Sequence, residues 1–572
     1  MRFFAELQRR NVIRAGVLYI GAVWALAQGI AQLAPVFGAP DWVTKWFVIA
    51  AAIGFPFWLA FAWVYEWTPQ GLKRESEVAA DASIVRATGR KMDRAIIAVL
   101  AIAVVLLLAE RFVPHRGEAS APVAENSIAV LPFVDMSQAR DQEYFSDGLS
   151  EELLDLLAKV PQLKVIARTS SFSFKGKNLD IAQIAHQLGV ATILEGSVRK
   201  SGNTLRITAQ LIRTSDSVHL WSDTYDRELT DVFKVQDEIA GAVVDALKLK
   251  LLQAPTVSAA RLTDNTQAHN HYLLGQELMA RGSIASYREA AAEYQRALDL
   301  DQNYVAAIVG IANAQAAVAD LTGDAAAADI ALHTADRALA AAPGNPDALA
   351  VRAWLRMQFL WDWAGARADY EAALEADPNA IDAMRRYAWL LAALGRLPEA
   401  IAPARRAHER DPMGTESTWA LGLLLTGSGK AAEAADLMRS SGKAASSEYV
   451  GLVLVESLVL SGQAADVSAA TSASAPRVQL LGAAFAEHAL GRADASTRAL
   501  DELISHDAAG MAYQIADVYA WRGETDVAFR WLETAYAQHD GGLTTIKFDP
   551  FMAPLRADPR YVALVRKLGL PE

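Results

Sequence analysis

The sequence predicts a multidomain fold class with three parts: three transmembrane α-helices, a small α/β domain and an all-α solenoid of helical repeats. Three observations support this prediction. Three apolar stretches near the N-terminus approach the ~20 residues that a helix needs to cross a bilayer. Short β-branched runs then alternate with amphipathic segments. From about residue 268 onward, Ala-rich segments recur at intervals of 34 to 41 residues.

The composition narrows the chemistry that the chain can perform. Its 572 residues include no cysteine, which excludes disulfides, cysteine-type zinc sites and thiol nucleophiles. The net charge of −12 is uneven, because residues 1–117 carry about +5 and the rest carries about −17. Since nucleic-acid binding needs basic stripes that neutralise phosphates, we expect no nucleic-acid partner.

The predicted membrane anchor covers residues 1–114, with helices at about 15–36, 46–65 and 95–113. Loops on the cytoplasmic side of a membrane are rich in Lys and Arg. Basic residues stand before the first helix and between the second and third, whereas the loop 38–45 holds one Lys. The N-terminus and the loop 71–94 are therefore expected on the cytoplasmic side, and everything after about residue 114 on the opposite side.

Gly21, Ala25 and Gly29 form a ladder of small residues on one face of the first predicted span. Such ladders allow helix backbones to approach closely. The ladder suits helix association in a homo-oligomer, and packing against the other spans of the same chain is the alternative. The spans carry no central charged residue, which argues against a transporter.

Residues 1–74 contain two characteristic segments, FFAELQRRNVIRAGVLYIGAVWALAQ and GFPFWLAFAWVYEWTPQGLKRE. They resemble a recurrent N-terminal membrane module of bacterial envelope proteins. The resemblance implies a membrane anchor and a bacterial source. Together with the charge pattern, it predicts a protein of the bacterial inner membrane whose N-terminus is cytoplasmic and whose residues after about 114 are periplasmic.

Residues 127–252 follow a linker at 115–126 and mix strand and helix patterns. Asp180 is the expected N-cap of a short helix. The order of the elements predicts a sheet with helices packed on it. The expected strands lie at 127–133, 162–168, 191–199, 204–213 and 218–225, and the expected helices at 142–160, 180–188 and 231–252.

The same region contains SIAVLPFVDMS, EYFSDGLSEELLDLLAKVPQLKVIARTSSFSFKGKN, LGVATILEGSVRKSGNTLRITAQLI and HLWSDTYDREL. These segments resemble the TolB N-terminal-like (FlgO-like) domain, nearly from end to end. The resemblance implies an envelope location and an α/β fold. In other proteins this domain stands beside adenylate cyclase or winged-helix DNA-binding modules. The sequence shows neither module, so their activities are not carried over.

The α/β domain offers three weak candidates for a site. Residues 175–178 (KGKN) lack the first Gly and the Ser or Thr of a phosphate-binding loop. Residues 168–171 (RTSS) are expected to close a strand, and they are more simply turn residues that bond their own backbone. The carboxylates at helical spacing are interpreted as one solvated face of a helix, and they are Asp147, Glu151, Glu152 and Asp155.

Residues 268–572, after a linker at 253–267, carry the repeats. Asp377-Pro378 and Asp411-Pro412 lie 34 residues apart, which is the tetratricopeptide period. Small, aromatic and small residues recur at fixed positions, in Ala290, Tyr294, Ala297, Ala366, Tyr370, Ala373, Ala400, Ala404 and Ala407. The pattern predicts a tetratricopeptide-repeat solenoid. Its last helix is expected to cap the solenoid, with Tyr561, Leu564 and Leu568 in the core.

The first helix of each repeat usually lines the binding face of such a solenoid. This nominates four residues for peptide binding, namely Arg352, Arg356, Arg385 and Arg386. Their positive charge suits an acidic peptide. A solvated helix face is the alternative interpretation.

The sequence shows no H-E-x-x-H, G-x-S-x-G or G-x-G-x-x-G pattern. We therefore predict no catalytic residue, no cofactor and no metal, and hence that the chain is not an enzyme. The predicted function is that of a membrane-anchored envelope scaffold that binds proteins or peptides through its repeats. One alternative is a transmembrane receptor that couples periplasmic binding to a cytoplasmic effector through the loop 71–94. A second is an enzyme with an unrecognised site between the middle and repeat domains.

Overall fold

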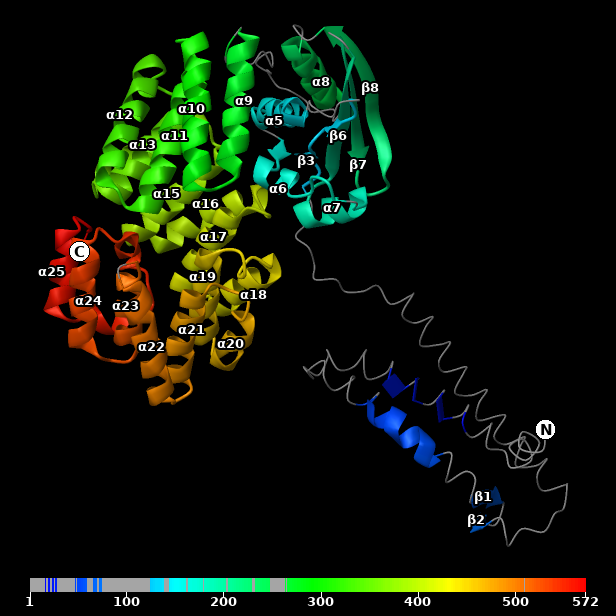
Figure 1. Ribbon diagram of the computed structural model, residues 1–572, viewed down its shortest axis with the longest axis vertical. Coiled ribbons are helices and arrows are strands. Elements are labelled where there is room, and N and C mark those ends of the chain that lie inside the picture. Colours follow the sequence, from blue (N-terminus) through cyan, green and yellow to red (C-terminus); the bar gives the residue numbers. More distant parts are fainter. Residues whose placement is uncertain are drawn as a thin grey trace. The chain divides into compact units, whose positions relative to one another are not determined.

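The computed structural model divides into two units, residues 1–122 and 123–572, and each is described by itself (Figure 1). In the first unit it describes residues 16, 19–20, 23–24, 26–27, 47, 49–58, 65–68 and 71–74. In the second it describes residues 124–137, 143–160, 163–177, 179–201, 204–228, 232–246, 263, 265–508 and 510–571.

The described part of the first unit contains an apolar helix, Ile49–Trp58. The Tyr19 hydroxyl donates a hydrogen bond of 2.8 Å to the carbonyl of Ala51, and its ring lies 5.6 Å from that of Phe55. The two stretches that hold these residues therefore contact each other. Most of the three predicted spans, and all of the Gly21, Ala25 and Gly29 ladder, lie outside the described residues.

A short hairpin follows the helix in the first unit. Strands β1 (Tyr65–Thr68) and β2 (Gly71–Arg74) pair antiparallel, with Tyr65 opposite Arg74. The sequence analysis placed these residues at the end of a span and the start of a loop. Alternating aromatic residues in YEWT favour a strand, and Gly71 begins its partner. The hairpin was not predicted.

The α/β domain opens the second unit and contains a six-stranded sheet in the order β5-β3-β6-β7-β8, with β4 also paired to β6 (Figure 1). Strands β3, β5 and β6 run parallel, and β6, β7 and β8 are antiparallel neighbours. The strands are β3 (Ser127–Val130), β4 (Val134–Asp135), β5 (Lys164–Val165), β6 (Thr192–Ser201), β7 (Thr204–Arg213) and β8 (Val218–Glu228). The helices are α5 (Glu143–Ala158), α6 (Arg168–Phe172), α7 (Ile181–Leu188) and α8 (Val232–Ala246).

Helices cover both faces of this sheet. Ile128 and Val130 of β3 point into a core with α5 and α8, whereas Ala129 between them points into a second core with α7. This alternation is the period of two that a strand imposes on its side chains. The predicted α/β arrangement is therefore confirmed, and Asp180 caps α7 through the amide of Gln183.

One predicted element is wrong in its extent. The strand expected at 162–168 is reduced to β5, Lys164–Val165, and the residues expected to close it begin helix α6 instead. The first turn of α6 is held by contacts from the repeat domain, which the sequence does not reveal. The backbone amide of Ala167 donates to the carbonyl of Arg410 at 2.7 Å.

The rest of the second unit is a solenoid of antiparallel helix pairs (Figure 1). Complete pairs are α9 and α10, α11 and α12, α13 and α14, α15 and α16, α17 and α18, α21 and α22, and α23 and α24. Helix α19 (Glu448–Leu460) has a short partner, η3 with α20 (Ala464–Asp466 and Val467–Ala470). The bounds of the other helices are Thr266–Ala280 (α9), Ile284–Leu300 (α10), Val305–Thr322 (α11), Ala325–Ala341 (α12), Pro346–Phe359 (α13), Trp363–Ala376 (α14), Ile381–Ala393 (α15), Leu397–Arg410 (α16), Thr415–Gly427 (α17), Ala431–Ser441 (α18), Pro476–Ala489 (α21), Ala493–Asp507 (α22), Ala512–Trp521 (α23), Thr525–Ala537 (α24) and Pro559–Lys567 (α25).

The small–aromatic–small pattern has the packing role that the sequence predicted. Tyr294 of α10 is fully buried between the first helices of two repeats. A Cβ added to Gly275 or Gly310 would lie 2.4 Å or 2.8 Å from its ring. Because protein interiors are close-packed, the glycines make room for the tyrosine. The tetratricopeptide-type solenoid is therefore built as predicted.

The longest repeat interval, the 41 residues from Ala297 to Ala338, arises from longer helices. Helix α11 has 18 residues and α12 has 17, whereas α13 and α14 have 14 each. Among the described residues, α11 is the helix long and apolar enough to cross a membrane, and half of it is buried in the protein. Its apolar residues pack against α10, α12 and α13, so it is a core helix of the solenoid.

The C-terminal segment folds back onto the middle of the solenoid. The Trp363 indole donates to the carbonyl of Leu568 at 2.7 Å, and the Trp389 indole donates to the Thr544 hydroxyl at 3.0 Å. Tyr561, Leu564 and Leu568 are buried, as predicted. The segment therefore joins α24 to helices α13–α15 instead of covering the last repeat alone.

Candidate functional site

The arginines predicted to bind a peptide lie on the first helices α13 and α15, and carboxylates of the same chain already engage three of them. Arg352 donates two hydrogen bonds to Asp369, of 2.8 Å and 2.7 Å, and contacts Asp336 at 3.0 Å. Arg356 reaches the same Asp369 at 2.8 Å. Bidentate pairs of this kind are strong and fix the side chain. Both guanidinium groups therefore join α13 to α14, the second helix of the same repeat, and Arg352 also joins it to α12.

Arg385 and Arg386 are placed differently. The side chain of Arg385 is 7% exposed and pairs with Asp382 at 3.2 Å and Glu416 at 3.4 Å. The Arg386 guanidinium lies 4.7 Å from the ring centre of Trp354, a cation–π arrangement. Peptide binding by the four arginines stays a prediction, and the charge that Arg352 and Arg356 present to a ligand is reduced by their internal partners.

A strip of aromatic side chains runs across four successive first helices, α13, α15, α17 and α19. It consists of Trp354, Trp389, Trp419 and Tyr449, whose neighbouring rings lie 6.2 Å, 4.6 Å and 5.2 Å apart. We call it the aromatic strip. Trp389 is nearly buried, Trp354 and Trp419 are half-buried, and Tyr449 is 54% exposed. These residues were not predicted as a site, although they recur at a spacing of 30 to 35 positions in the sequence.

Carboxylates border the aromatic strip. Asp320 of α11 accepts a hydrogen bond of 2.7 Å from the Trp354 indole, and Glu416 and Asp382 lie beside Arg385. Asp320 is exposed to water but surrounded by dense protein, and this desolvation raises the pKa of its carboxyl to about 6.

Two more carboxylates lie at the edge of the aromatic strip that faces the α/β domain. Desolvation, with the negative charges of Asp382 and Asp377, raises the pKa of Asp347 to about 6. Desolvation also raises the pKa of Asp155 on α5 well above its usual value, and Glu151 and Asp347 add to this. Both side chains are solvent-exposed. In both cases desolvation is the largest cause of the raised pKa, and neighbouring carboxylates add to it.

The α/β domain and the repeats share a polar junction. The Ser170 hydroxyl donates to Asp411 Oδ1 at 2.7 Å, the Thr169 hydroxyl donates to the same oxygen, and the Ser417 hydroxyl donates to Oδ2 at 3.1 Å. The Ser170 oxygen accepts from the amide of Met413 at 2.8 Å. Residues that the sequence interpreted as turn residues therefore bond the buried Asp411 of the solenoid.

Three of the four acidic residues of α5 do not form the solvated face that the sequence predicts, whereas Asp155 is exposed. Glu152 contacts His269 of α9 at 2.6 Å, and Glu151 pairs with Arg168 at 2.9 Å. Asp147 is buried and pairs with Lys175 at 2.5 Å, which gives the lysine of KGKN a structural partner. Helical spacing shows which residues share a face, but α9, which covers this face, lies more than a hundred residues along the chain.

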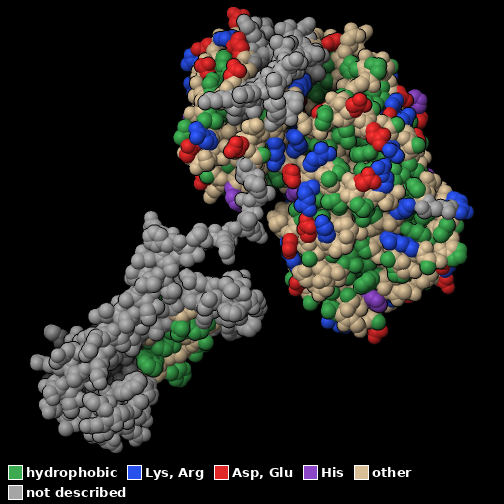
Figure 2. Space-filling model, turned by 180° about the vertical axis from the view of Figure 1, so that it is seen from behind, with side chains coloured by type: hydrophobic (Ala, Val, Ile, Leu, Met, Phe, Trp, Pro, Cys, Tyr) green, Lys and Arg blue, Asp and Glu red, His purple; other side chains and the backbone are tan. Residues whose placement is uncertain are grey.

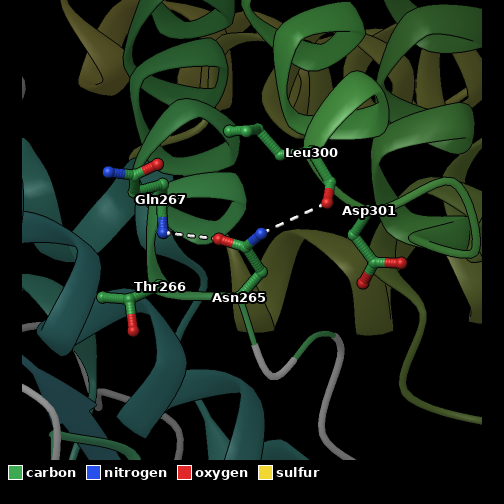
Figure 3. Close-up of a pocket in the computed structure, with 5 residues that line it drawn as sticks. All are labelled: Asn265, Thr266, Gln267, Leu300 and Asp301. Carbon is green, nitrogen blue, oxygen red and sulfur yellow. Dashed lines mark hydrogen bonds between the residues drawn. The ribbon is translucent and has the colours of Figure 1, made fainter.

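Figure 3 shows a surface hollow where α9 begins and α10 ends. Asn265 lies at its centre, accepts from the amide of Gln267 at 3.0 Å and donates to the carbonyl of Leu300 at 3.2 Å. Its polar atoms are thus engaged in capping α9. Thr266 and Asp301 complete the lining. The hollow is explained by the helix ends that form it.

The fold and these surfaces together define a class: an α/β domain docked on a solenoid of tetratricopeptide type. A family model for the second domain of HilA/YgeH-like transcriptional regulators matches residues 124–242, which is the described α/β domain. The match supports a domain shared with that family for this part of the chain alone. The TolB-like resemblance of the same residues stays a prediction.

Among particular proteins, the chain is similar to a "putative adenylate cyclase 3" of Rhizobium meliloti (strain 1021), with 40% identity over 185 residues. The match covers 32% of this chain and 32% of that protein, so the chain spans about a third of the relative's length. The prediction that the chain is not an enzyme is contradicted by this finding, because the relative bears the name of an enzyme.

Solved structures align with parts of the chain at low sequence identity. A tetratricopeptide-repeat protein from Parabacteroides merdae aligns with 48% of this chain and all of its own, at 14% identity and a TM-score of 0.31. The PilF protein of Pseudomonas aeruginosa aligns with 36% of this chain and 92% of its own, at 19% identity and a TM-score of 0.29.

Proposed function

We propose that the chain is a scaffold that binds other proteins through its repeat solenoid. The observation that carries this proposal is the aromatic strip, because aromatic side chains that are partly exposed in a row are enriched in protein interfaces. Trp354, Trp419 and Tyr449 offer such side chains on the first helices α13, α17 and α19. Repeat solenoids present extended surfaces of this kind to their partners.

We further propose that residues 1–114 anchor this scaffold in a bacterial inner membrane, with the N-terminus cytoplasmic and the α/β and repeat domains periplasmic. Ile49, Ile53 and Phe57 are 46%, 61% and 73% exposed and stand four residues apart, hence on one face of their helix. Figure 2 shows the described part of this unit as a patch of hydrophobic side chains. An apolar face of this kind suits lipid or a neighbouring span.

The scaffold proposal is tested by crosslinking in intact cells, followed by purification of the full chain and of a variant with Trp419→Ala and Tyr449→Ala. We expect partners that crosslink to the parent and are lost from the variant. A variant with Tyr536→Ala, which changes an aromatic residue on second helix α24, is the matched control. Identical partners for all three proteins would contradict the proposal.

The orientation is tested separately with a topology reporter fused after residue 252. Activity characteristic of the periplasm is expected. Cytoplasmic activity of the fused reporter would overturn the proposed orientation, and it would leave the binding proposal standing.

A second candidate function follows from the Rhizobium relative. We propose adenylate cyclase activity, or participation in cyclic-nucleotide signalling, as this alternative, and the 40% identity over 185 residues supports it. A receptor that couples binding at the repeats to a cytoplasmic effector through the loop 71–94 belongs to the same alternative. Purified full-length protein would be incubated with ATP and Mg²⁺ or Mn²⁺, and cyclic AMP would be measured. No cyclic AMP above the heat-inactivated sample would contradict catalysis by this chain.

A further inference from the structure

The structure indicates the chemistry of the partner at the aromatic strip. This inference rests on the proposed scaffold function and makes it more specific. We infer that the strip binds an extended segment of a partner protein that carries Lys or Arg side chains. Their aliphatic stems would lie on Trp354, Trp419 and Tyr449, and their charged ends would reach Asp320, Glu416 and Asp382.

The charges that border the strip favour a cation. Asp320, Asp382 and Glu416 are all exposed. Arg385 is nearly buried and already shared between Asp382 and Glu416. The other arginines at the strip are also engaged, because Arg386 lies over Trp354 and Arg477 pairs with Glu448. The exposed carboxylates therefore favour a basic segment over an acidic one.

The strip already shows how it holds a cation. The Arg386 guanidinium lies over Trp354 at 4.7 Å from the ring centre, while Asp320 bonds the indole of the same Trp354. This combination of aromatic face and carboxylate is the environment in which Arg and Lys side chains are recognised. Two and three repeats further along, Trp419 and Tyr449 contact each other, and Tyr449 lies within electrostatic reach of Glu416 and Glu448.

The reach of the strip sets the length of the probe. Its neighbouring ring centres lie 6.2 Å, 4.6 Å and 5.2 Å apart. The row of rings from Trp354 to Tyr449 is therefore shorter than about 20 Å, which an extended chain of about six residues covers. Dye-labelled peptides of that length with alternating Ala and Lys, or alternating Ala and Glu, are therefore suitable probes.

The experiment titrates the purified full-length protein in detergent into each peptide at low salt and follows fluorescence anisotropy. We expect the Ala–Lys peptide to bind and the Ala–Glu peptide not to bind. The double variant Asp320→Asn, Glu416→Gln should bind the Ala–Lys peptide about fivefold more weakly, because it loses two exposed ion pairs. Tyr449→Ala should weaken binding as well.

The control variant separates the strip from the general negative charge of the protein. Glu289→Gln removes one exposed carboxylate from second helix α10, and it should bind like the parent. Circular dichroism establishes that each variant is folded. Equal affinity of the double variant, Glu289→Gln and the parent would overturn the inference.

The outcomes also distinguish this inference from the scaffold proposal. Binding of the Ala–Glu peptide alone overturns the basic-segment inference and leaves the scaffold proposal intact. The same holds if neither peptide binds while the variant with Trp419→Ala and Tyr449→Ala still loses its crosslinked partners. Loss of peptide binding together with unchanged crosslinked partners in every variant overturns both.

Discussion

Single carboxyl groups inside the C-terminal half have unusual surroundings. Asp517 of α23 is 2% exposed, and Asp549 beside it accepts a hydrogen bond of 3.1 Å from the Tyr513 hydroxyl. Burial and the neighbouring carboxylates Asp549 and Glu456 raise the pKa of Asp517 well above its usual value. Burial likewise raises the pKa of Asp549 and of Glu456. Like charges held together in this way favour protonation.

The cluster makes stability depend on pH in a defined direction. A carboxyl whose folded pKa is raised stabilises the fold at pH values below its unfolded pKa, near 4, and loses this contribution as the pH rises through the folded value. We expect the urea midpoint to fall between pH 5 and pH 8, and Asp517→Asn to reduce that fall. Asp436→Asn, at an exposed carboxylate of α18, should not change it. An unchanged pH profile in Asp517→Asn would contradict this account.

Some single residues were predicted correctly from the sequence and others were not, because only some of them depend on neighbours in the sequence. Helix N-caps such as Asp180 depend on neighbours in the sequence and were predicted correctly. Arg352 and Arg356 were identified as charges on a first helix, but their partner Asp369 lies on another helix, so their pairing was not predictable. The aromatic strip was missed because each of its members is an ordinary apolar residue of its own helix.

At the scale of elements, the repeats depend on small residues facing large ones. Gly275→Ala places a Cβ 2.4 Å from the ring of the fully buried Tyr294. Overpacking of this kind costs about 1–3 kcal/mol, which exceeds the helix propensity that Ala adds, about 1 kcal/mol at most. We expect a lower thermal midpoint, measured by circular dichroism. Gly344→Ala, where the added Cβ has free space, should leave the midpoint unchanged.

Elements were predictable where their pattern is local. Strands β7 and β8 and the helices of the repeats follow alternation or helical spacing, and the structure confirms them. Helix α6 was missed because its residues, RTSSF, favour a turn, and Asp411, which bonds two of its hydroxyls, lies 241 residues away from Ser170. The short partner of α19 is likewise set by packing within its repeat.

At the scale of the whole molecule, the α/β domain and the solenoid are joined through Asp411. Asp411→Ala would leave the hydroxyls of Thr169, Ser170 and Ser417 without their acceptor. The buried Ser170 and Ser417 would each cost about 1–3 kcal/mol if left unsatisfied. We expect the second unit of the chain to unfold in two steps, with the α/β domain separating first. The measurement is urea unfolding followed by near-UV circular dichroism and by tryptophan fluorescence. Coincident transitions for the variant would contradict the prediction, and Asp436→Asn serves as its control.

The return of the C-terminal segment onto the middle repeats has a consequence for biosynthesis. Trp363 bonds Leu568, 205 residues later in the chain, so its indole has no such partner until nearly the whole protein has been made. Contacts between residues so distant in sequence form slowly, and apolar surface exposed meanwhile invites aggregation. The nascent solenoid is therefore expected to depend on a chaperone until its last few residues emerge, and a chain stopped short of Leu568 should be degraded in the cell although most of its helices are complete.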